Sequence, residues 1–258
     1  MKFDLDKFFE NLKEEKIFSL FEKFLPWEII KKLKEYLLDI VPELPSTIPI
    51  KTPIQENLFI SLEREVIPLK EIKEKGGRYF FRGENIKGAI LFAGCILMDR
   101  KIFFEDGVIV EPYALIQGPA YFSEKTQIRH TAYIRGSVYT GKNAVIGHTT
   151  EVKNSIFLSS AKAAHFAYIG DSILGKDVNL GAGTKLANLK FTKKEITLII
   201  NKEKVYTKLK KFGAILGDRC QTGCNSVLQP GTLIGKDSFV FPGVVGGPGY
   251  FPPKSKLK

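Results

Sequence analysis

Histidine is scarce in this chain, and its three copies follow one another at a nearly constant distance. His130, His148 and His165 lie 18 and 17 residues apart in a sequence of 258 residues. A neutral imidazole can accept a proton near pH 7, which makes each of them a candidate general base. His165 stands among small alanines in the stretch AAHFAYIGD, residues 163–171, and these would leave room for a substrate. We therefore select His165 as the candidate base.

A six-residue repeat runs through most of the sequence and must position these histidines. Apolar residues recur at this interval over 86–152, and only Thr140 departs from the pattern. The phase then slips by one residue at 157 and again at 174, and the repeat resumes over 216–240. A period of six fits neither a helix nor a simple strand meander, and it is typical of coils built from three short strands. We predict an all-β solenoid, a left-handed parallel β-helix with coils of about 18 residues.

The repeat also predicts that the histidines stack in one column, because each occupies the second position after an inward residue. Three histidines can bind zinc, as in trimeric β-helices of the gamma carbonic anhydrase type. Stacked coils, however, would put the outer two about 9.6 Å apart, whereas zinc ligands lie about 2 Å from the metal. We therefore expect no metal site. A purely structural stack of imidazoles remains an alternative to catalysis.

The remaining segments complete a predicted domain organisation. Residues 1–43 carry an apolar stripe at helical spacing and are predicted to form a helical hairpin that could cap the first coil. Residues 44–80 are a proline-rich linker that leads into the solenoid. The β-helix spans 81–247, and its insertion at 187–214 contains ITLII and KVYT separated by NKEK, which predicts a β-hairpin. Residues 248–258 are predicted to be a basic tail.

Charge and cysteine content argue against several classes of protein. The net charge is +11, with eight lysines between 190 and 211 and three more in the last five residues. These lysines lack the interleaved aromatics of a single-strand binder, so they suit a small polyanion better than nucleic acid, although a merely solvated charge run is an alternative. Three cysteines do not make a disulfide framework, and the N-terminus resembles neither a signal peptide nor a membrane span. We expect a cytoplasmic protein without nucleic-acid or membrane partners.

Residues 128–190 carry the motifs of a known enzyme family. The motifs are Arg135-Gly136, Glu151-Val152-Lys153, KAAHFAYIGD at 162–171 and NLGAGT at 179–184. With no gap between them, they resemble the C-terminal left-handed β-helix acetyltransferase domain of the bifunctional glucosamine-1-phosphate acetyltransferase/N-acetylglucosamine-1-phosphate uridyltransferase. The insertion and the stretch GAILGDRCQTGCNSVLQPG are similar to the archaeal sugar-1-phosphate nucleotidyltransferase/acetyltransferases.

This resemblance implies a role for each matched residue. His165 would take a proton from the 2-amino group of glucosamine 1-phosphate as that group attacks the thioester of acetyl-CoA, and Asn188 and Glu151 would complete the catalytic set. The other implied contacts are to the sugar phosphate from Arg135 and Lys153, to the sugar from Tyr168 and Asn179, and to acetyl-CoA from Ala182, Cys224 and Pro242.

Several positions depart from the family pattern. Gly136 replaces a proline, Ala164 replaces a glycine, and Cys224 stands where the family has a serine near coenzyme A. The family's loop lysine that contacts phosphate has no fixed counterpart, and Lys208, Lys210 or Lys211 could substitute for it. These changes affect the expected sugar preference and cofactor affinity more than the reaction type.

The resemblance also implies an assembly and a division of labour. Left-handed β-helices of this family associate as homotrimers, with active sites between neighbouring solenoids. The first 80 residues offer no glycine-rich phosphate loop after a strand, so nucleotidyl transfer is not expected and a separate uridyltransferase would supply that step. A non-catalytic trimeric scaffold or sugar-phosphate-binding module is the alternative function, and a metal-dependent hydratase is a weaker one.

Overall fold

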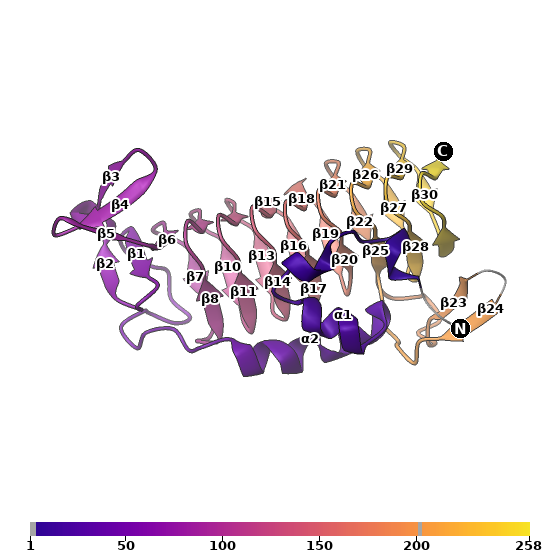
Figure 1. Cartoon of the computed structure of the whole chain (residues 1–258), viewed down its shortest axis with the longest axis horizontal. Coiled ribbons are helices and arrows are strands. Elements are labelled where there is room, and N and C mark those ends of the chain that lie inside the picture. The colour runs from indigo at the N-terminus through magenta and orange to yellow at the C-terminus, as the bar shows by residue number, and fades with distance from the viewer. Residues whose placement is uncertain (1–3, 201–202) are drawn as a thin grey trace.

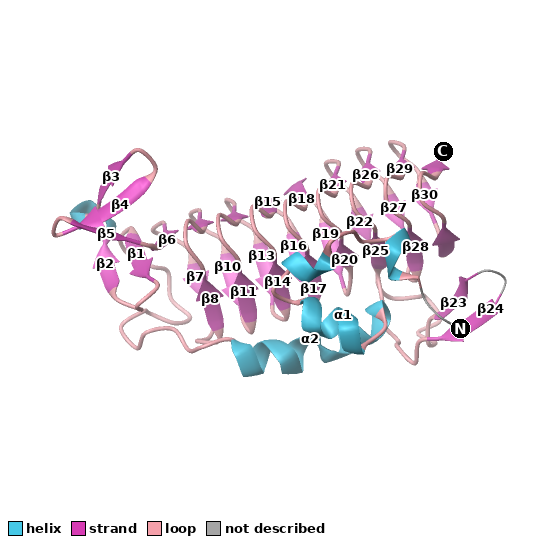
Figure 2. Ribbon diagram, in the orientation of Figure 1, coloured by secondary structure: helices cyan, strands magenta, loops and turns pink. Residues whose placement is uncertain are grey.

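The computed structural model describes residues 4–200 and 203–258. Short strands stack into an elongated solenoid whose coils follow one another along its long axis (Figures 1 and 2). The fold is a left-handed parallel β-helix with a small N-terminal helical region, which confirms the prediction from the six-residue repeat. The first three residues of the predicted helical hairpin, and Asn201 and Lys202 of the predicted hairpin turn, lie outside the described residues.

Three sheets run the length of the solenoid, and we call them the first, second and third faces in the order in which the chain meets them. The first face contains β6 (Gly88–Leu91), β9 (Ile109–Val110), β12 (Gln127–Ile128), β15 (Val145–His148), β18 (Lys162–His165), β21 (Asn179–Leu180), β26 (Gln221–Thr222), β29 (Phe239–Val240) and β32 (Lys256–Leu257). The second contains β7 (Ile96–Leu97), β10 (Leu115–Gln117), β13 (Tyr133–Arg135), β16 (Glu151–Lys153), β19 (Tyr168–Gly170), β22 (Lys185–Leu186), β27 (Val227–Leu228) and β30 (Val245–Gly246). The third contains β8 (Ile102–Phe104), β11 (Ala120–Phe122), β14 (Val138–Thr140), β17 (Ser155–Phe157), β20 (Ile173–Leu174), β25 (Ala214–Leu216), β28 (Thr232–Ile234) and β31 (Gly249–Phe251).

The interior of the solenoid is filled by one inward side chain from each strand. From Phe104 to Val152 these are the positions that the repeat predicts, and all are buried. In the first coil the predicted phase is wrong by one residue, because Leu91 and Leu97 are fully buried while Phe92 is partly exposed. The extra residue lies in the turn between β7 and β8.

The two later phase slips are single-residue deletions at one corner of the solenoid. Five residues instead of six separate the inward positions over 152–157 and 169–174, and in both cases the missing residue is at the turn from the second face to the third. Asn154 and Asp171 occupy left-handed positions in these shortened turns, with φ of 46° and 49°. Asparagine and aspartate tolerate this conformation better than most residues.

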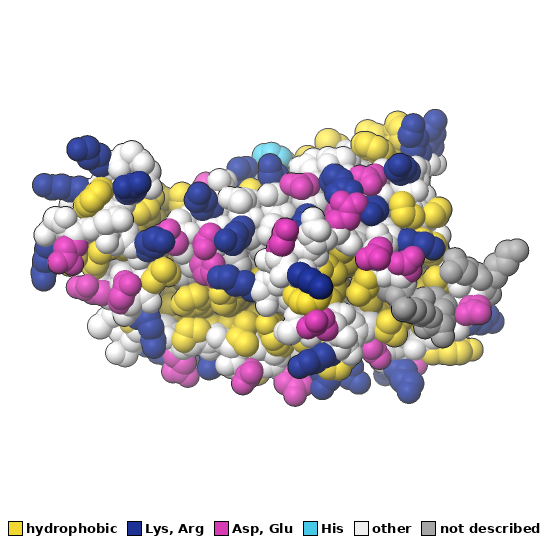
Figure 3. Space-filling model, viewed as in Figure 1, with side chains coloured by type: hydrophobic (Ala, Val, Ile, Leu, Met, Phe, Trp, Pro, Cys, Tyr) yellow, Lys and Arg dark blue, Asp and Glu magenta, His cyan; other side chains and the backbone are white. Residues whose placement is uncertain are grey.

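The N-terminal segment lies along the third face and does not cap the first coil (Figure 1). It comprises η1 (Leu5–Lys7), η2 (Leu12–Glu14), α1 (Phe18–Lys23) and α2 (Pro26–Ile40), so the first predicted helix is reduced to two 3-10 turns and a short α-helix. Its apolar side chains pack on outward residues of that face, namely Tyr139, Ile156, Ile173, Ile215 and Leu233. The segment covers this face because the face is itself apolar, and hydrophobic side chains also gather between solenoid and helices in Figure 3.

The predicted linker contains strands that cover the end of the solenoid. β1 (Leu58–Ser61) pairs antiparallel with both β2 (Val66–Pro68) and β6, which extends the first face beyond its first coil. After η3 (Leu69–Glu71), the strands β3 (Lys73–Lys75), β4 (Arg78–Phe81) and β5 (Glu84–Ile86) form a separate antiparallel sheet. A small core of Phe59, Ile67 and Ile90 joins the two parts.

The predicted basic tail, residues 248–258, belongs to the solenoid. β31 pairs with β28 and β32 pairs with β29, and Leu257 is 8% exposed. The sequence concealed this coil because Gly246 takes an inward position where the repeat has an apolar residue.

The β-hairpin predicted within the insertion at 187–214 is confirmed. β23 (Thr197–Ile200) and β24 (Glu203–Tyr206) pair antiparallel. Ile196, Leu198 and Ile200 are buried against the same apolar cluster as the N-terminal segment. The hairpin therefore extends the cover of the third face and leaves the first and second faces open.

The packing of α2 on the third face predicts unequal effects of two leucine substitutions. Leu33→Ala removes a fully buried side chain and should cost about 2–5 kcal/mol of stability in the helical segment. Leu38→Ala, on the same helix but 42% exposed, should change it by less than about 1 kcal/mol. Trp27, the single tryptophan, is buried at the start of α2, so its fluorescence during denaturant titration measures both effects. Equal losses for the two variants would contradict the docking of α2.

Candidate functional site

His165 ends β18 at the corner between the first and second faces, in a column of histidines. His148 and His165 are partners in the register of β15 and β18. The rings of His130 and His148 stack with centroids 5.5 Å apart and planes 7° from parallel. The backbone register therefore aligns the three histidines as the spacing predicts, but only the rings of His130 and His148 stack.

The three histidines differ in their surroundings. The ring of His130 packs edge-on against Tyr113, and the Nδ1 atom of His148 lies 3.2 Å from the carbonyl oxygen of His130. Phe166 completes this stack, with its ring 5.4 Å from that of His148. His165 lies outside the stack, is exposed, and its ring has no hydrogen bond to any residue in the described part of the chain. A structural stack thus accounts for two histidines but leaves His165 open to a ligand.

The same column continues through the three residues expected to contact acetyl-CoA. Ala182, Cys224 and Pro242 each follow an inward residue by two positions, as His165 does, and those inward residues are register partners from coil to coil. At about 4.8 Å per coil, Cys224 lies about 9.6 Å from His165 along the axis. A hollow of about 240 Å³, lined by Gly223, Phe241 and Pro242 among others, lies beside this end of the column.

The backbone beside His165 offers a hydrogen-bond donor. The amides of Gly181 and Gly183 donate to the carbonyl oxygens of Thr222 and His165. Among residues 4–200 and 203–258, the amide of Ala182 between them has no acceptor. It lies one coil from His165, where an anionic oxygen could accept its hydrogen bond.

A second group of predicted residues meets on the second face. The Nη1 atom of Arg135 lies 2.6 Å from Oε1 of Glu151, and this ion pair raises the pKa of Arg135. Glu151 is in turn the register partner of Tyr168 on the next coil. The structure therefore brings together three residues, Arg135, Glu151 and Tyr168, the first and last of which are 33 positions apart in the sequence.

Asp171 joins the other predicted residues of this face into one network. Its carboxylate accepts hydrogen bonds from the side-chain amides of Asn188 and Asn154, and lies 3.6 Å from Nζ of Lys153. The hydroxyl of Tyr168 donates to Oδ1 of Asn188 at 3.3 Å. Asp171 is 4% exposed, so a buried carboxylate holds the half-buried ammonium group of Lys153 and the buried amide of Asn188 in place. Sequence reasoning assigned no role to Asp171 or Asn154, although the phase slips mark the corners they occupy.

The two groups lie at opposite edges of the second face, and some predicted residues belong to neither. His165 precedes β19, whereas Arg135 and Lys153 end β13 and β16 at the opposite edge of the second face. Asn179 is exposed on the first face, as register partner of Lys162 and Gln221. The lysines considered as phosphate ligands, Lys208, Lys210 and Lys211, lie in the return segment of the insertion and form no ion pair with other described residues.

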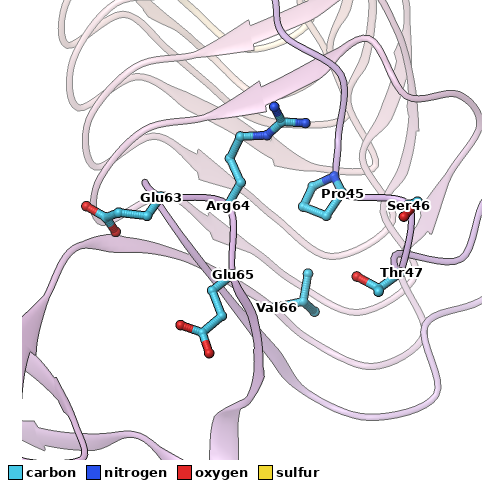
Figure 4. Close-up of a pocket in the computed structure, with 7 residues that line it drawn as sticks. All are labelled: Pro45, Ser46, Thr47, Glu63, Arg64, Glu65 and Val66. Carbon is cyan, nitrogen blue, oxygen red and sulfur yellow. The ribbon is translucent and has the colours of Figure 1, made fainter.

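A larger hollow lies at the other end of the solenoid. It has a volume of about 600 Å³ and lies between Pro45–Thr47 and the turn that joins β1 to β2 (Figure 4). Its side chains include Glu63, Arg64 and Glu65, and none of the predicted site residues lines it. Volume alone therefore does not locate the candidate site.

No group of three or more His, Cys, Asp or Glu side chains in 4–200 and 203–258 is arranged to hold a metal ion. No helix in the same ranges is long and apolar enough to span a bilayer.

Comparisons with known proteins agree with the motifs. Residues 116–212 match the family model described as the GMPPB C-terminal domain. The bifunctional sugar-1-phosphate nucleotidylyltransferase/acetyltransferase of Sulfurisphaera tokodaii is 38% identical over 88 residues, which are 34% of this chain and 22% of that protein. The bifunctional protein GlmU of Methanococcus vannielii is 41% identical over 83 residues, 32% of this chain and 20% of that protein, and GlmU of Trichodesmium erythraeum is 39% identical over 85 residues, 33% and 14%. The resemblance inferred from the motifs is confirmed, and the matched region spans about a fifth of the length of the first two relatives.

The network around Asp171 should contribute to stability. Asp171→Ala removes the acceptor of two side-chain amides and the partner of Lys153, so we expect a loss of about 2 kcal/mol or more in the free energy of unfolding. Asp39→Ala, at an exposed position of α2, should change it by less than about 0.5 kcal/mol. Chemical denaturation of both variants measures the difference, and equal stabilities would show that the network is only a surface feature.

Proposed function

We propose that this chain is an acetyl-CoA-dependent N-acetyltransferase that acts on an amino-sugar 1-phosphate, with glucosamine 1-phosphate as the preferred acceptor. The observation that carries the proposal is His165, an exposed base in a column whose next positions, Ala182 and Cys224, are suited to a coenzyme. Similarity to bifunctional nucleotidylyltransferase/acetyltransferases supports membership of a transferase family. We place the reaction in the cytoplasm, in the synthesis of nucleotide-sugar precursors, with a separate protein supplying the uridylyl step.

His165 acts as the general base in this proposal. The amine nitrogen of the sugar forms a bond to the thioester carbon, and the imidazole accepts the proton that the nitrogen loses. The carbon–sulfur bond then breaks, and the imidazolium returns the proton to the coenzyme A thiolate. General base catalysis of this kind contributes about 10² to 10⁴ in rate.

The amide of Ala182 is suited to stabilise the oxyanion of the tetrahedral intermediate. It lies one coil from His165 and has no acceptor within the described chain. A fixed donor aimed at developing charge lowers the barrier more than one that must reorganise. Cys224 and Pro242 follow at one-coil steps and would line the path of the pantetheine arm and nucleotide.

The second face would hold the sugar phosphate. Arg135 and Lys153 supply cations, and Glu151 and Asp171 fix their positions. We assign Glu151 to this positioning role because its carboxylate is engaged with the guanidinium. Tyr168 and Asn188 form a hydrogen-bonded pair between the phosphate side and the base, where they can contact the sugar ring. Since His165 and the cations lie at opposite edges, we propose that a homotrimer completes the site with residues of a neighbouring solenoid.

The test of the base compares two histidines in the same column. His165→Asn should lower kcat for acetylation of glucosamine 1-phosphate by about 10² or more, with little change in KM, because it removes only the proton acceptor. His130→Asn, two coils away, should leave kcat within about twofold. Thiol release from acetyl-CoA measures both. If the unmodified protein binds sugar phosphates without turnover, the non-catalytic module is the better description.

The coenzyme path can be tested through Cys224, the exposed cysteine. Burial raises the pKa of Cys95 and of Cys220 to about 12, so neither should form a reactive thiolate at pH 7. A maleimide should therefore modify one of the three thiols in the native protein. Acetyl-CoA should slow that modification, and Cys224→Ser should abolish it, as measured by mass spectrometry. Modification at an unchanged rate in saturating acetyl-CoA would place the coenzyme elsewhere.

A further inference from the structure

A groove of about 380 Å³ lies where α2 passes the corner between the second and third faces. Its volume falls within the range of small-molecule sites. Four cations from three elements line it, together with polar side chains: Lys31 and Lys34 of α2, Arg135 of β13, Lys153 of β16, Gln117 and Asn154. No carboxylate is among the residues that line the groove.

The solenoid holds α2 in place over this groove. The side-chain amide of Asn154 donates to the carbonyl oxygen of Ile30 at 3.1 Å, and Nζ of Lys101 donates to that of Val41 at 3.1 Å. Ile30 and Leu33 are buried beneath the helix. Lys31 and Lys34 are therefore presented from a fixed backbone, and Asn154 connects that backbone to Asp171 and the rest of the site.

The four cations divide into two pairs by their existing partners. Arg135 is paired with Glu151 and Lys153 with Asp171. Lys31 and Lys34 have no ion pair with any residue of 4–200 or 203–258. Residues three apart on a helix have Cβ atoms about 5–6 Å from one another. This is within the Debye length of about 8 Å at physiological salt, so an anion bound between the two ammonium groups would offset their repulsion. The α2 side of the groove thus presents two exposed ammonium groups that no described carboxylate pairs with.

The position of the groove indicates the order in which its cations would meet a ligand that reaches from His165. It lies at the edge of the second face opposite His165, and the six residues from His165 to Asp171 span at most about 20 Å in an extended chain. Arg135 and Lys153 can reach back toward the sugar, but Lys31 and Lys34 lie beyond them on α2. A ligand whose first phosphate lies at Arg135 and Lys153 would have to extend past that phosphate to contact Lys31 and Lys34.

We propose that Lys31 and Lys34 bind a second phosphate group where the acceptor carries one, so that the site that takes glucosamine 1-phosphate also takes an amino sugar linked through a diphosphate. Arg135 and Lys153 hold the phosphate next to the sugar, and the α2 lysines hold the next one. The placement of the amine rests on the proposed function. The affinity of the groove for a diphosphate does not, and it can be measured without acetyl transfer.

Binding of inorganic pyrophosphate and inorganic phosphate to the full chain tests the groove directly. By calorimetry we expect pyrophosphate to bind at least tenfold more tightly than phosphate. The double variant Lys31→Ala/Lys34→Ala should bring that ratio close to one. Lys32→Ala is the matched control, because Lys32 is on the same helix but pairs with Glu35 and lies outside the groove. A ratio near one in the unmodified protein, or an unchanged ratio in the double variant, overturns the proposal.

Kinetics separate this inference from the proposed function. Glucosamine 1-phosphate is compared with glucosamine carried on a nucleoside diphosphate and on a simple alkyl diphosphate. The double variant should raise KM at least tenfold for the diphosphate acceptors and leave KM for acetyl-CoA unchanged, and the preferred ester identifies the natural source. Pyrophosphate binding without any acetyl transfer would contradict the proposed function alone. Acetyl transfer with equal use of monophosphate and diphosphate acceptors, unchanged in the double variant, would contradict the α2 site alone.

Discussion

Backbone hydrogen bonds between successive coils are the interaction on which this structure depends. They fix the register of each strand on the one before, so residues about one coil apart in sequence become neighbours in space. The alignment of His165 with Ala182 and of Glu151 with Tyr168 follows from that register, with no dedicated loop to bring them together. A chain with few long loops can in this way assemble a site from residues far apart in sequence.

The site forms where the regular register is altered. Loss of one residue at two successive corners puts Asn154 and Asp171 in left-handed turns, and their side chains connect the second face to α2 and to the insertion. The N-terminal segment is therefore part of the architecture of the site, because the same asparagine contacts Ile30 and Asp171. Its apolar packing on the third face also leaves the other two faces free for ligands or neighbouring chains.

The sequence predicts those features that one residue type repeated at a fixed interval can encode. The six-residue period predicted the inward positions from Phe104 to Val240 and the alignment of the histidines, and the runs ITLII and KVYT predicted the hairpin that interrupts the repeat. It failed where a different residue filled an inward position, as Gly246 does in the last coil, or where a neighbouring apolar residue satisfied the pattern equally well, as Phe92 does beside Leu91. The place of α2 depends on outward apolar residues of the third face. The six-residue period marks inward positions, so it does not predict where α2 packs.

Equal coil spacing has a further consequence for how such a protein can change. Positions along the column are evenly spaced. The separation between His165 and any later position is therefore a whole number of strand spacings. Gain or loss of an entire coil would shift every downstream residue by one strand spacing along the solenoid axis. The residue would still face the same side of the solenoid. Variation in the length of the ligands accommodated would then proceed in discrete increments of about 4.8 Å.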